Sequence, residues 1–99
     1  MKYRISSEAQ KDIEGIWLYT SETWSVDQAD RYYHLIFDEI EFIAENPTSG
    51  KDYGHVREGY YRAKVKSHFI FYRIGEADGV VEIIRVLHQQ MDIENRLND

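Results

Sequence analysis

Cysteine is absent from this sequence of 99 residues, and proline occurs once. Without cysteine the chain can form neither a disulfide framework nor a thiolate metal site, which fits a reducing compartment. No apolar run approaches the ~20 residues of a membrane-spanning helix, and the first residues offer no apolar signal segment. We therefore expect a cytoplasmic protein that makes no membrane contact.

Metal ligands are scarce as well. The four histidines, His34, His55, His68 and His88, stand at spacings that match no common metal site. Ordinary surface or strand positions explain them better than a metal site does. We expect neither a metal nor another cofactor.

Positive charge is in the minority, because 18 Asp and Glu residues oppose 12 Lys and Arg residues and leave a net charge of −6. An acidic chain is poorly suited to a phosphate backbone, so we expect no direct, specific binding of nucleic acid. One stretch is nevertheless basic, with Glu58 as its only acid: Arg57, Arg62, Lys64, Lys66 and Arg73. A binding patch for a nucleic acid or an acidic protein explains this stretch about as well as a solvated strand face does.

Apolar residues make up 42% of the chain and aromatic residues 14%, which is enough to build a folded core. A second core would not fit into this length. We therefore expect a single domain that covers residues 1–99.

The first half of the chain begins with a short strand at residues 1–5 and continues as an amphipathic helix. Ser7 and Gln10 have the spacing of a capping box. They open an apolar stripe at steps of three and four residues that includes Trp17 and Trp24. We expect both tryptophans to be largely buried against the sheet.

A second, longer helix follows almost at once. Ser25 and Gln28 repeat the capping-box spacing, and the apolar stripe behind them ends at Asn46-Pro47. Two helices with so short a connection are expected to form an antiparallel hairpin.

Strand patterns dominate the second half, after a long loop from Pro47 to Gly59. Alternation at residues 61–66, an apolar run at 69–74 and a β-branched run at 80–87 predict three strands joined by short turns. Residues 91–97 predict a short helical tail. The order β-α-α-β-β-β indicates an α+β fold with two layers, in which the helical hairpin packs on a small antiparallel sheet.

Two segments, 68–73 and 83–92, resemble the paired strands of ParE toxins, and the most specific part is the Arg-Val-Leu-His run that ends at His88, shortly before Met91-Asp92. The helical pattern is similar too, at Ile13, Ile16, Tyr19, Trp24, Gln28-Ala29 and Tyr32, and so is the helix-terminating segment Asn46-Pro47 with Gly50. The chain thus resembles the ParE toxins of the RelE/ParE superfamily over nearly its whole length.

This resemblance implies the toxin component of a type II toxin–antitoxin system. Such a toxin binds a ParD-like antitoxin in a hetero-oligomer and inhibits DNA gyrase when it is released. The RelE branch of the same fold implies an alternative, a ribosome-dependent mRNA endoribonuclease, and fold alone does not choose between them. A further alternative is a protein without toxicity that only binds its antitoxin.

RNA cleavage without a metal requires an acid or base and several cations on one surface. The candidates for such a site are Arg62, Arg73, Arg85 and His88. Alternation along the last strand predicts that Arg85 shares a face with Ile83, whereas His88 shares the other face with Glu82. The cation and the titratable group then do not converge, so we expect a non-enzymatic inhibitor with no catalytic residue.

The target-contacting elements expected from the resemblance are the basic central strand, the last strand and the tail. The candidate residues are Arg62, Lys64, Arg73, Arg85, His88, Met91, Asp92 and Arg96. Arg73 and Arg85 interrupt apolar strands, so pairing with a carboxylate, across the sheet or in the tail at Asp92 or Glu94, is an equally good interpretation.

Three apolar residues point away from the inward stripes of the helices. Leu35 and Phe42 are seven residues apart and share a face of the second helix, and Leu18 lies nearly opposite the inward face of the first. Single exposed apolar residues are ordinary. Together these three are our candidates for contact with an antitoxin that folds over the toxin.

Overall fold

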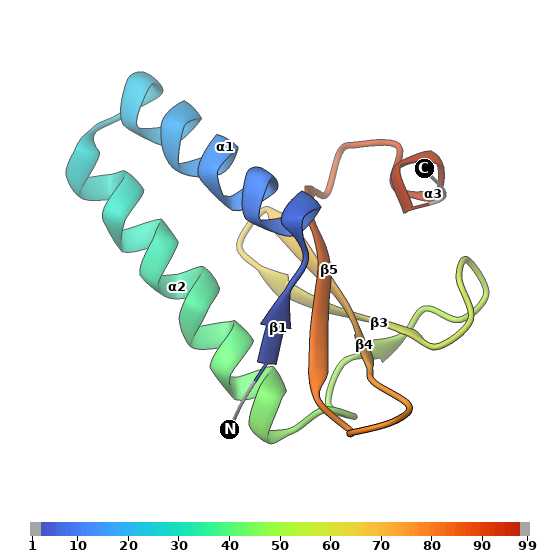
Figure 1. Cartoon of the computed structure of the whole chain (residues 1–99). Helices are drawn as coiled ribbons and strands as arrows, with labels where there is room; N and C mark the ends of the chain where they lie inside the picture. The colour runs from blue at the N-terminus through green and yellow to red at the C-terminus, as the bar shows by residue number, and fades with distance from the viewer. Residues whose placement is uncertain (1–2, 98–99) are drawn as a thin grey trace.

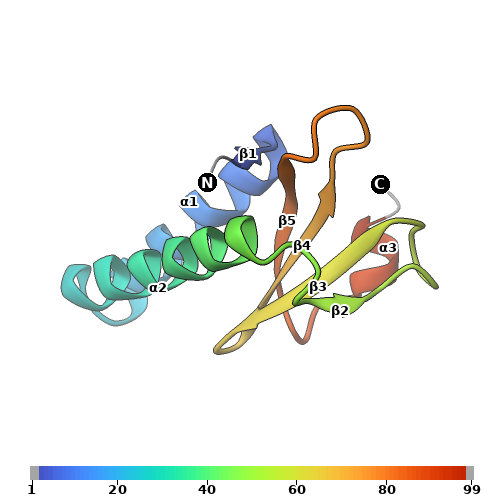
Figure 2. The same ribbon diagram turned by 90° about the horizontal axis from the view of Figure 1, so that it is seen from below.

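The computed structural model describes residues 3–97 as a five-stranded sheet with helices on both faces. The elements are β1 (Tyr3–Ile5), α1 (Ser7–Thr23), α2 (Val26–Glu45), β2 (Lys51–Asp52), β3 (Tyr60–Val65), β4 (His68–Ile74), β5 (Val81–His88) and α3 (Ile93–Leu97). Figures 1 and 2 show α1 and α2 as a hairpin on one side of the sheet and α3 on the other. We call these sides the hairpin face and the tail face.

The strand order is β1-β5-β4-β3-β2. The predicted meander of three antiparallel strands is confirmed as β3, β4 and β5. The sheet differs from the prediction at both edges, because β1 pairs in parallel with β5, and β2 pairs with β3 from within the predicted loop. The helical hairpin carries the chain from β1 back over the sheet, and two residues in β2 are too few to display an alternating pattern.

The second helix starts where the sequence predicts, with the Ser25 hydroxyl accepting a hydrogen bond from the Gln28 N–H at 3.0 Å. For the first helix the predicted cap is wrong by one residue. Ser6 holds that position, and its hydroxyl accepts from the Ala9 N–H. The same residue donates from its backbone N–H and its hydroxyl to carbonyls of β5 at 2.9 and 2.8 Å, so pairing of β1 with β5 determines where α1 begins.

The core of the hairpin face joins the inward stripes of both helices to the sheet. Its fully buried members include Ile36 and Ile40 of α2 and Ile70 and Ile83 of the sheet. A Phe, Leu or Ile side chain buried in this way stabilises a fold by roughly 1.5–3 kcal/mol. Burial of these stripes therefore fixes the hairpin on the sheet.

The two tryptophans are less buried than the apolar stripe predicted. Trp17 is half-buried and its indole N–H donates to Asp30 Oδ1 at 2.9 Å. Trp24 is 68% exposed, so the expectation is wrong for this residue. It ends α1 at the tip of the hairpin, which extends past the edge of the sheet in Figure 1.

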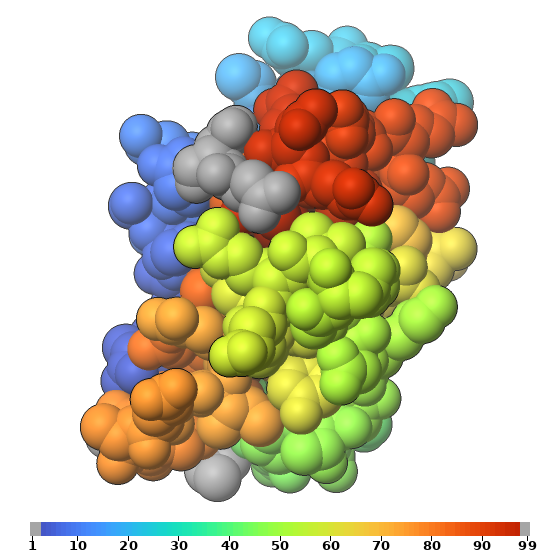
Figure 3. All heavy atoms as spheres, turned by 90° about the vertical axis from the view of Figure 1, so that its right-hand side faces the viewer, coloured from blue at the N-terminus to red at the C-terminus, as the bar shows by residue number. Residues whose placement is uncertain are grey.

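A second, smaller core lies on the tail face. Phe71 of β4 and Leu87 of β5 are covered there by Leu97 of α3. Figure 3 looks onto this side and shows α3 (red) against the segment that leads into β3 (yellow-green). Arg57 donates from Nη1 to the Leu97 carbonyl at 3.3 Å, which adds a polar tie between the two. The predicted helical tail is thus confirmed and belongs to the folded core.

A β-bulge in β5 changes which residues share a face. Phe71 opposes Arg85 while Tyr72 opposes Ile83, so Ile84 is the extra residue. Beyond the bulge, Val86 packs in the hairpin-face core and Leu87 in the tail-face core. Two predictions about which residues share a face of β5 are therefore wrong.

Arg85 does not share a face with Ile83, and His88 does not share one with Glu82. Arg85 alternates with Val86 and lies on the tail side, whereas His88 lies with Val86 on the hairpin side. The predicted separation of Arg85 from His88 nevertheless holds.

The short strand β1 pairs only with the first part of β5. Beyond it, Asp12 of α1 contacts the outer edge of β5. The carboxylate accepts from the Val86 N–H at 3.0 Å and from Arg85 Nε and Nη2 at 2.8 and 3.1 Å. Both side chains are only 15% exposed. One carboxylate thus satisfies a strand edge, pairs with a largely buried arginine and anchors the first helix.

The end of α2 is tied to the sheet through Tyr72, which is fully buried. Its hydroxyl donates to the Pro47 carbonyl at 2.9 Å and accepts from the Gly50 N–H at 3.0 Å. Burial raises the pKa of Tyr72, so the phenol stays neutral. A Cβ at position 50 would overlap the Tyr72 hydroxyl, which explains the glycine.

We predict that Gly50→Ala lowers the free energy of unfolding by about 1–3 kcal/mol, because the added methyl group displaces the Tyr72 hydroxyl. Gly15→Ala is the matched control. Its Cβ would meet nothing within 4 Å in α1, so it should stabilise the helix by about 0.5–1 kcal/mol. Urea unfolding measures both, and equal effects of the two substitutions would contradict the Tyr72 contact.

Asp12→Ala should lower the free energy of unfolding by roughly 2–4 kcal/mol, because Arg85 loses its carboxylate and the Val86 N–H loses its acceptor. Glu8→Ala removes an exposed acid from the same helix and should cost at most about 0.5 kcal/mol. A similar loss in both variants, measured by urea unfolding, would show that the strand-edge contact adds no stability.

Candidate functional site

An open groove of about 970 Å³ lies between the helical hairpin and the end of the sheet where β3 turns into β4 and β5 ends. Ile16, Trp24 and Leu35 contribute apolar walls from the helices. His68 and His88 line the groove from the strands. The exposed Trp24 at the hairpin tip is therefore part of a concave surface.

The two histidines face each other across β4 and β5, with ring centroids 5.1 Å apart and ring planes nearly perpendicular. His68 Nδ1 lies 2.7 Å from the Tyr32 hydroxyl of α2. Burial, and then the neighbouring His88, lower the pKa of His68 to about 4, so the ring is neutral near pH 7. The His68 side of this floor is therefore polar and uncharged beneath apolar walls.

The groove is also basic at its rim. Lys11, Arg31 and Lys66 line it, and the only acid among its described lining residues is Asp12, which is paired with Arg85. By contrast, residues 7–45, which span α1 and α2, carry ten acidic and two basic side chains. The groove therefore attracts negative charge although the hairpin as a whole repels it.

The three candidates for antitoxin contact are exposed as expected, Leu18 at 53%, Leu35 at 41% and Phe42 at 51%. They do not form one strip. Leu35 lines the groove and, with Phe42, also a smaller hollow beside Lys64, whereas Leu18 lines neither. Leu35 and Phe42 can therefore serve one continuous partner, and Leu18 lies apart from it.

Arg62 and Lys64 lie on the tail face and stack on aromatic rings. The Arg62 guanidinium is 4.2 Å from the centroid of Phe69 and 5.6 Å from that of Tyr53, and Lys64 Nζ is 6.0 Å from Phe69. Within residues 3–97 neither cation lies within ion-pair distance of a carboxylate. Their charge is thus available to a partner while the rings fix their positions.

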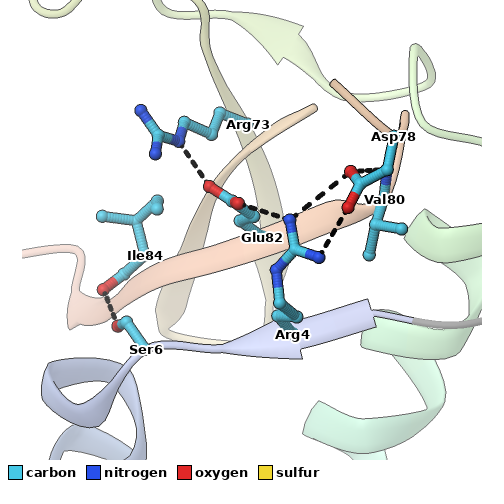
Figure 4. Close-up of polar contacts among 7 residues, drawn as sticks. All are labelled: Arg4, Ser6, Arg73, Asp78, Val80, Glu82 and Ile84. Atoms are coloured by element: carbon cyan, nitrogen blue, oxygen red, sulfur yellow. Dashed lines mark hydrogen bonds and ion pairs between the residues drawn. The ribbon is translucent and has the colours of Figure 1, made fainter. Parts of the chain in front are cut away.

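Arg73 has a cross-strand partner, as one interpretation of the sequence expected, but the partner is Glu82. Figure 4 shows the network: Arg73 Nε and Arg4 Nη2 each lie 2.6 Å from a Glu82 oxygen, and Arg4 also pairs with Asp78 at 2.9 Å. Arg4 and then Arg73 lower the pKa of Glu82. Arg73 is therefore occupied in linking β4 and β5 to β1.

Arg85 is paired with Asp12 and also donates to the Arg96 carbonyl at 3.4 Å, so its predicted pairing with Asp92 or Glu94 is replaced by one with the first helix. Asp92 instead accepts from Asn95 within the tail. Asp92 and Arg96 are exposed.

The eight candidates for target contact therefore divide between two faces. Met91 and His88 line the groove, Arg62 lies on the tail face, and Lys64 lies near Phe69 and also borders the smaller hollow. The four nuclease candidates do not meet, because His88 faces the hairpin, Arg62 is stacked on Phe69 on the tail face, and Arg73 and Arg85 are held in ion pairs. Within residues 3–97 no three His, Asp or Glu side chains gather to hold a metal ion, and no helix is long and apolar enough to cross a membrane.

Sequence reasoning missed Asp12, Tyr32 and His68 as parts of the site. The one signal for Asp12 was an acid beside the apolar stripe of the first helix. Tyr32 belongs to the apolar stripe of α2, and its contact with His68 joins positions 36 residues apart, which no local pattern indicates.

The chain matches the family described as "ParE toxin of type II toxin-antitoxin system, parDE" over residues 3–93. It is 43% identical to "Toxin ParE1" of Caulobacter vibrioides over 95 residues, 96% of each chain. It is 38% identical to "Toxin ParE1" of Mycobacterium tuberculosis, over 97% of each chain.

A solved structure titled "Chromosomal ParDE TA system from P. aeruginosa" has the same fold, with a TM-score of 0.74 at 13% identity over 89% of this chain and 95% of that one. The resemblance expected from the strand and helix motifs is thereby confirmed. The chain belongs to the ParE toxin family of type II toxin–antitoxin systems.

Proposed function

We propose that this toxin inhibits DNA gyrase in the cytoplasm and that a ParD-like antitoxin neutralises it in a hetero-oligomer. The family membership supports the toxin–antitoxin pairing. The observation that favours gyrase over RNA is the separation of the candidate catalytic groups. His88 lies in the groove, whereas Arg73 and Arg85 are held by Glu82 and Asp12.

The antitoxin is proposed to occupy the groove and the adjoining surface of α2. Leu35 connects the two hollows, and Trp24 and Phe42 extend the apolar surface at either end. Exposed apolar residues around a concavity are typical of a surface that is covered by a partner. The basic rim favours an acidic antitoxin segment.

The target is proposed to contact the tail face, where Arg62 and Lys64 are held by aromatic rings and Arg96 stands on α3. Arg62 and Arg96 lie on the face opposite the proposed antitoxin groove, whereas Lys64 also borders the smaller hollow beside Phe42. An antitoxin in the groove then neutralises the toxin either by reaching around to this face or by blocking approach through its bulk.

The deciding experiment incubates the purified protein with gyrase, ATP and supercoiled plasmid, and a translating ribosome assay runs beside it. Accumulation of linear DNA with intact mRNA supports gyrase inhibition. Cleaved mRNA with unaffected plasmid would establish the RelE-type endoribonuclease instead. No effect in either assay, from a folded protein, would indicate a family member that only binds its antitoxin.

We predict that the double substitution Arg62→Gln and Lys64→Gln weakens gyrase inhibition by about tenfold or more, because two charged contacts are lost. The control substitutes Glu41→Gln and Glu45→Gln, which neutralise two exposed charges on α2 away from both hollows. Titration of each variant in the plasmid assay measures the effect. Equal potency of the two double variants would contradict a target surface at Arg62 and Lys64.

His88→Gln separates gyrase inhibition from RNA cleavage. A general acid or base contributes roughly 10²–10⁴-fold to a reaction rate, so this change would nearly silence a nuclease. For a gyrase inhibitor that contacts its target through the tail face we expect a loss of at most about 0.5–1.5 kcal/mol, the value of one hydrogen bond. Growth inhibition at equal expression, without antitoxin, measures it, and complete loss of toxicity in a folded variant would favour the nuclease.

A further inference from the structure

The floor of the groove carries two imidazole nitrogens whose hydrogen-bonding roles follow from their neighbours. Both rings use Nδ1 for contacts inside the protein, which leaves both Nε2 atoms for a partner. Among the described residues no buried side-chain nitrogen or oxygen lacks a hydrogen-bond partner. Since neither Nε2 has a partner, both atoms are open to solvent.

His68 presents a hydrogen-bond acceptor. The Tyr32 hydroxyl has a single hydrogen and donates it to the Val65 carbonyl at 2.9 Å. His68 Nδ1, 2.7 Å from the same oxygen and 3.5 Å from the Ser67 hydroxyl, then carries the proton and donates it to Tyr32. A neutral ring protonated at Nδ1 leaves a lone pair on Nε2.

His88 presents a hydrogen-bond donor. The backbone N–H of Gln90 donates to His88 Nδ1 at 3.1 Å, so this nitrogen carries the lone pair. The neutral ring is then protonated at Nε2. The adjacent rings thus offer one acceptor and one donor to the same occupant of the groove.

We propose that the groove recognises a carboxamide, an Asn or Gln side chain of a partner protein, through this histidine pair. The carboxamide oxygen accepts from His88 Nε2–H, and its NH₂ group donates to His68 Nε2. A carboxylate offers only acceptors and would face the His68 lone pair, whereas an ammonium group offers only donors. The carboxamide satisfies both nitrogens at once, and unpaired polar groups beneath an apolar partner would be costly.

A metal ion fits this floor poorly, although two adjacent histidines invite that interpretation. Coordination through Nε2 would move the His88 proton to Nδ1. That proton would point at the Gln90 N–H, so two donors would oppose each other. The fixed backbone contact therefore selects a hydrogen-bonding partner over a metal.

The surroundings define the rest of the partner. Apolar walls at Ile16 and Trp24 and a rim with Lys11, Arg31 and Lys66 fit an amphipathic, acidic segment that places its carboxamide among apolar side chains. This inference rests on the proposed antitoxin partnership and deepens it, because it specifies the residue type at the centre of the contact.

The first test reads the tautomers of the free protein by ¹⁵N–¹H correlation of the histidine side chains. We expect the Nδ1–H form for His68 and the Nε2–H form for His88. The same tautomer on both rings would overturn the proposal, because the floor would then lack either the donor or the acceptor.

The second test selects random 16-residue peptides, displayed on phage, on the immobilised full chain. We expect acidic amphipathic peptides with Asn or Gln enriched at one position. In a synthesised winner, replacing this amide by Leu or Glu should weaken binding about tenfold, as expected for two lost hydrogen bonds. Against His88→Phe the preference for the amide over Leu should disappear, whereas His55→Phe, a size-matched change on an exposed loop, should keep it.

Enrichment of an acid or a hydroxyl at this position would overturn the proposal, and so would binding that requires added zinc chloride and is lost in EDTA. The tautomer measurement remains decisive if His88→Phe does not fold. Neither measurement involves gyrase. A negative gyrase assay therefore leaves this inference standing, and a failed peptide selection leaves the gyrase result intact.

Discussion

The carboxylate of Asp12 joins the first helix to the last strand and, through Arg85, to the tail. It satisfies the free N–H of Val86 at the edge of β5 and neutralises Arg85, whose guanidinium also reaches the carbonyl of Arg96 in α3. The first helix, the last strand and the tail are therefore coupled through one side chain. Because it anchors α1 beside β5, it also sets the position of the wall above the two histidines.

The longer helices and strands were predictable because the apolar pattern of each one extends along its whole length. Helical stripes and alternating strands repeat several times within α1, α2 and β3 to β5, so single exceptions do not obscure them. The bulge at Ile84 was not predictable, since neither glycine nor proline marks it. One extra residue there was enough to change which residues of β5 share a face with Arg85 and which share one with His88.

The site was harder to predict than the fold. Exposure of Leu35 and Phe42 followed from their position on the helix, because periodicity alone decides which side of a helix faces the core. The groove could not be predicted in this way, since it is formed by the hairpin tip and by strand ends that are distant in sequence. Carboxylate pairing of Arg73 and Arg85 was one of two interpretations that the sequence left open, and the actual partners, Glu82 and Asp12, depend on sheet register and on helix placement.

The pairing of Tyr3–Ile5 with Val81–Ile83 has a consequence for synthesis on the ribosome. The first strand emerges long before the strand beside which it lies, so the sheet closes only when most of the chain has been translated. Until then the helical hairpin has made and exposed its apolar stripe. A nascent chain of this topology therefore passes through a stage in which apolar side chains of the hairpin lack the sheet that later covers them.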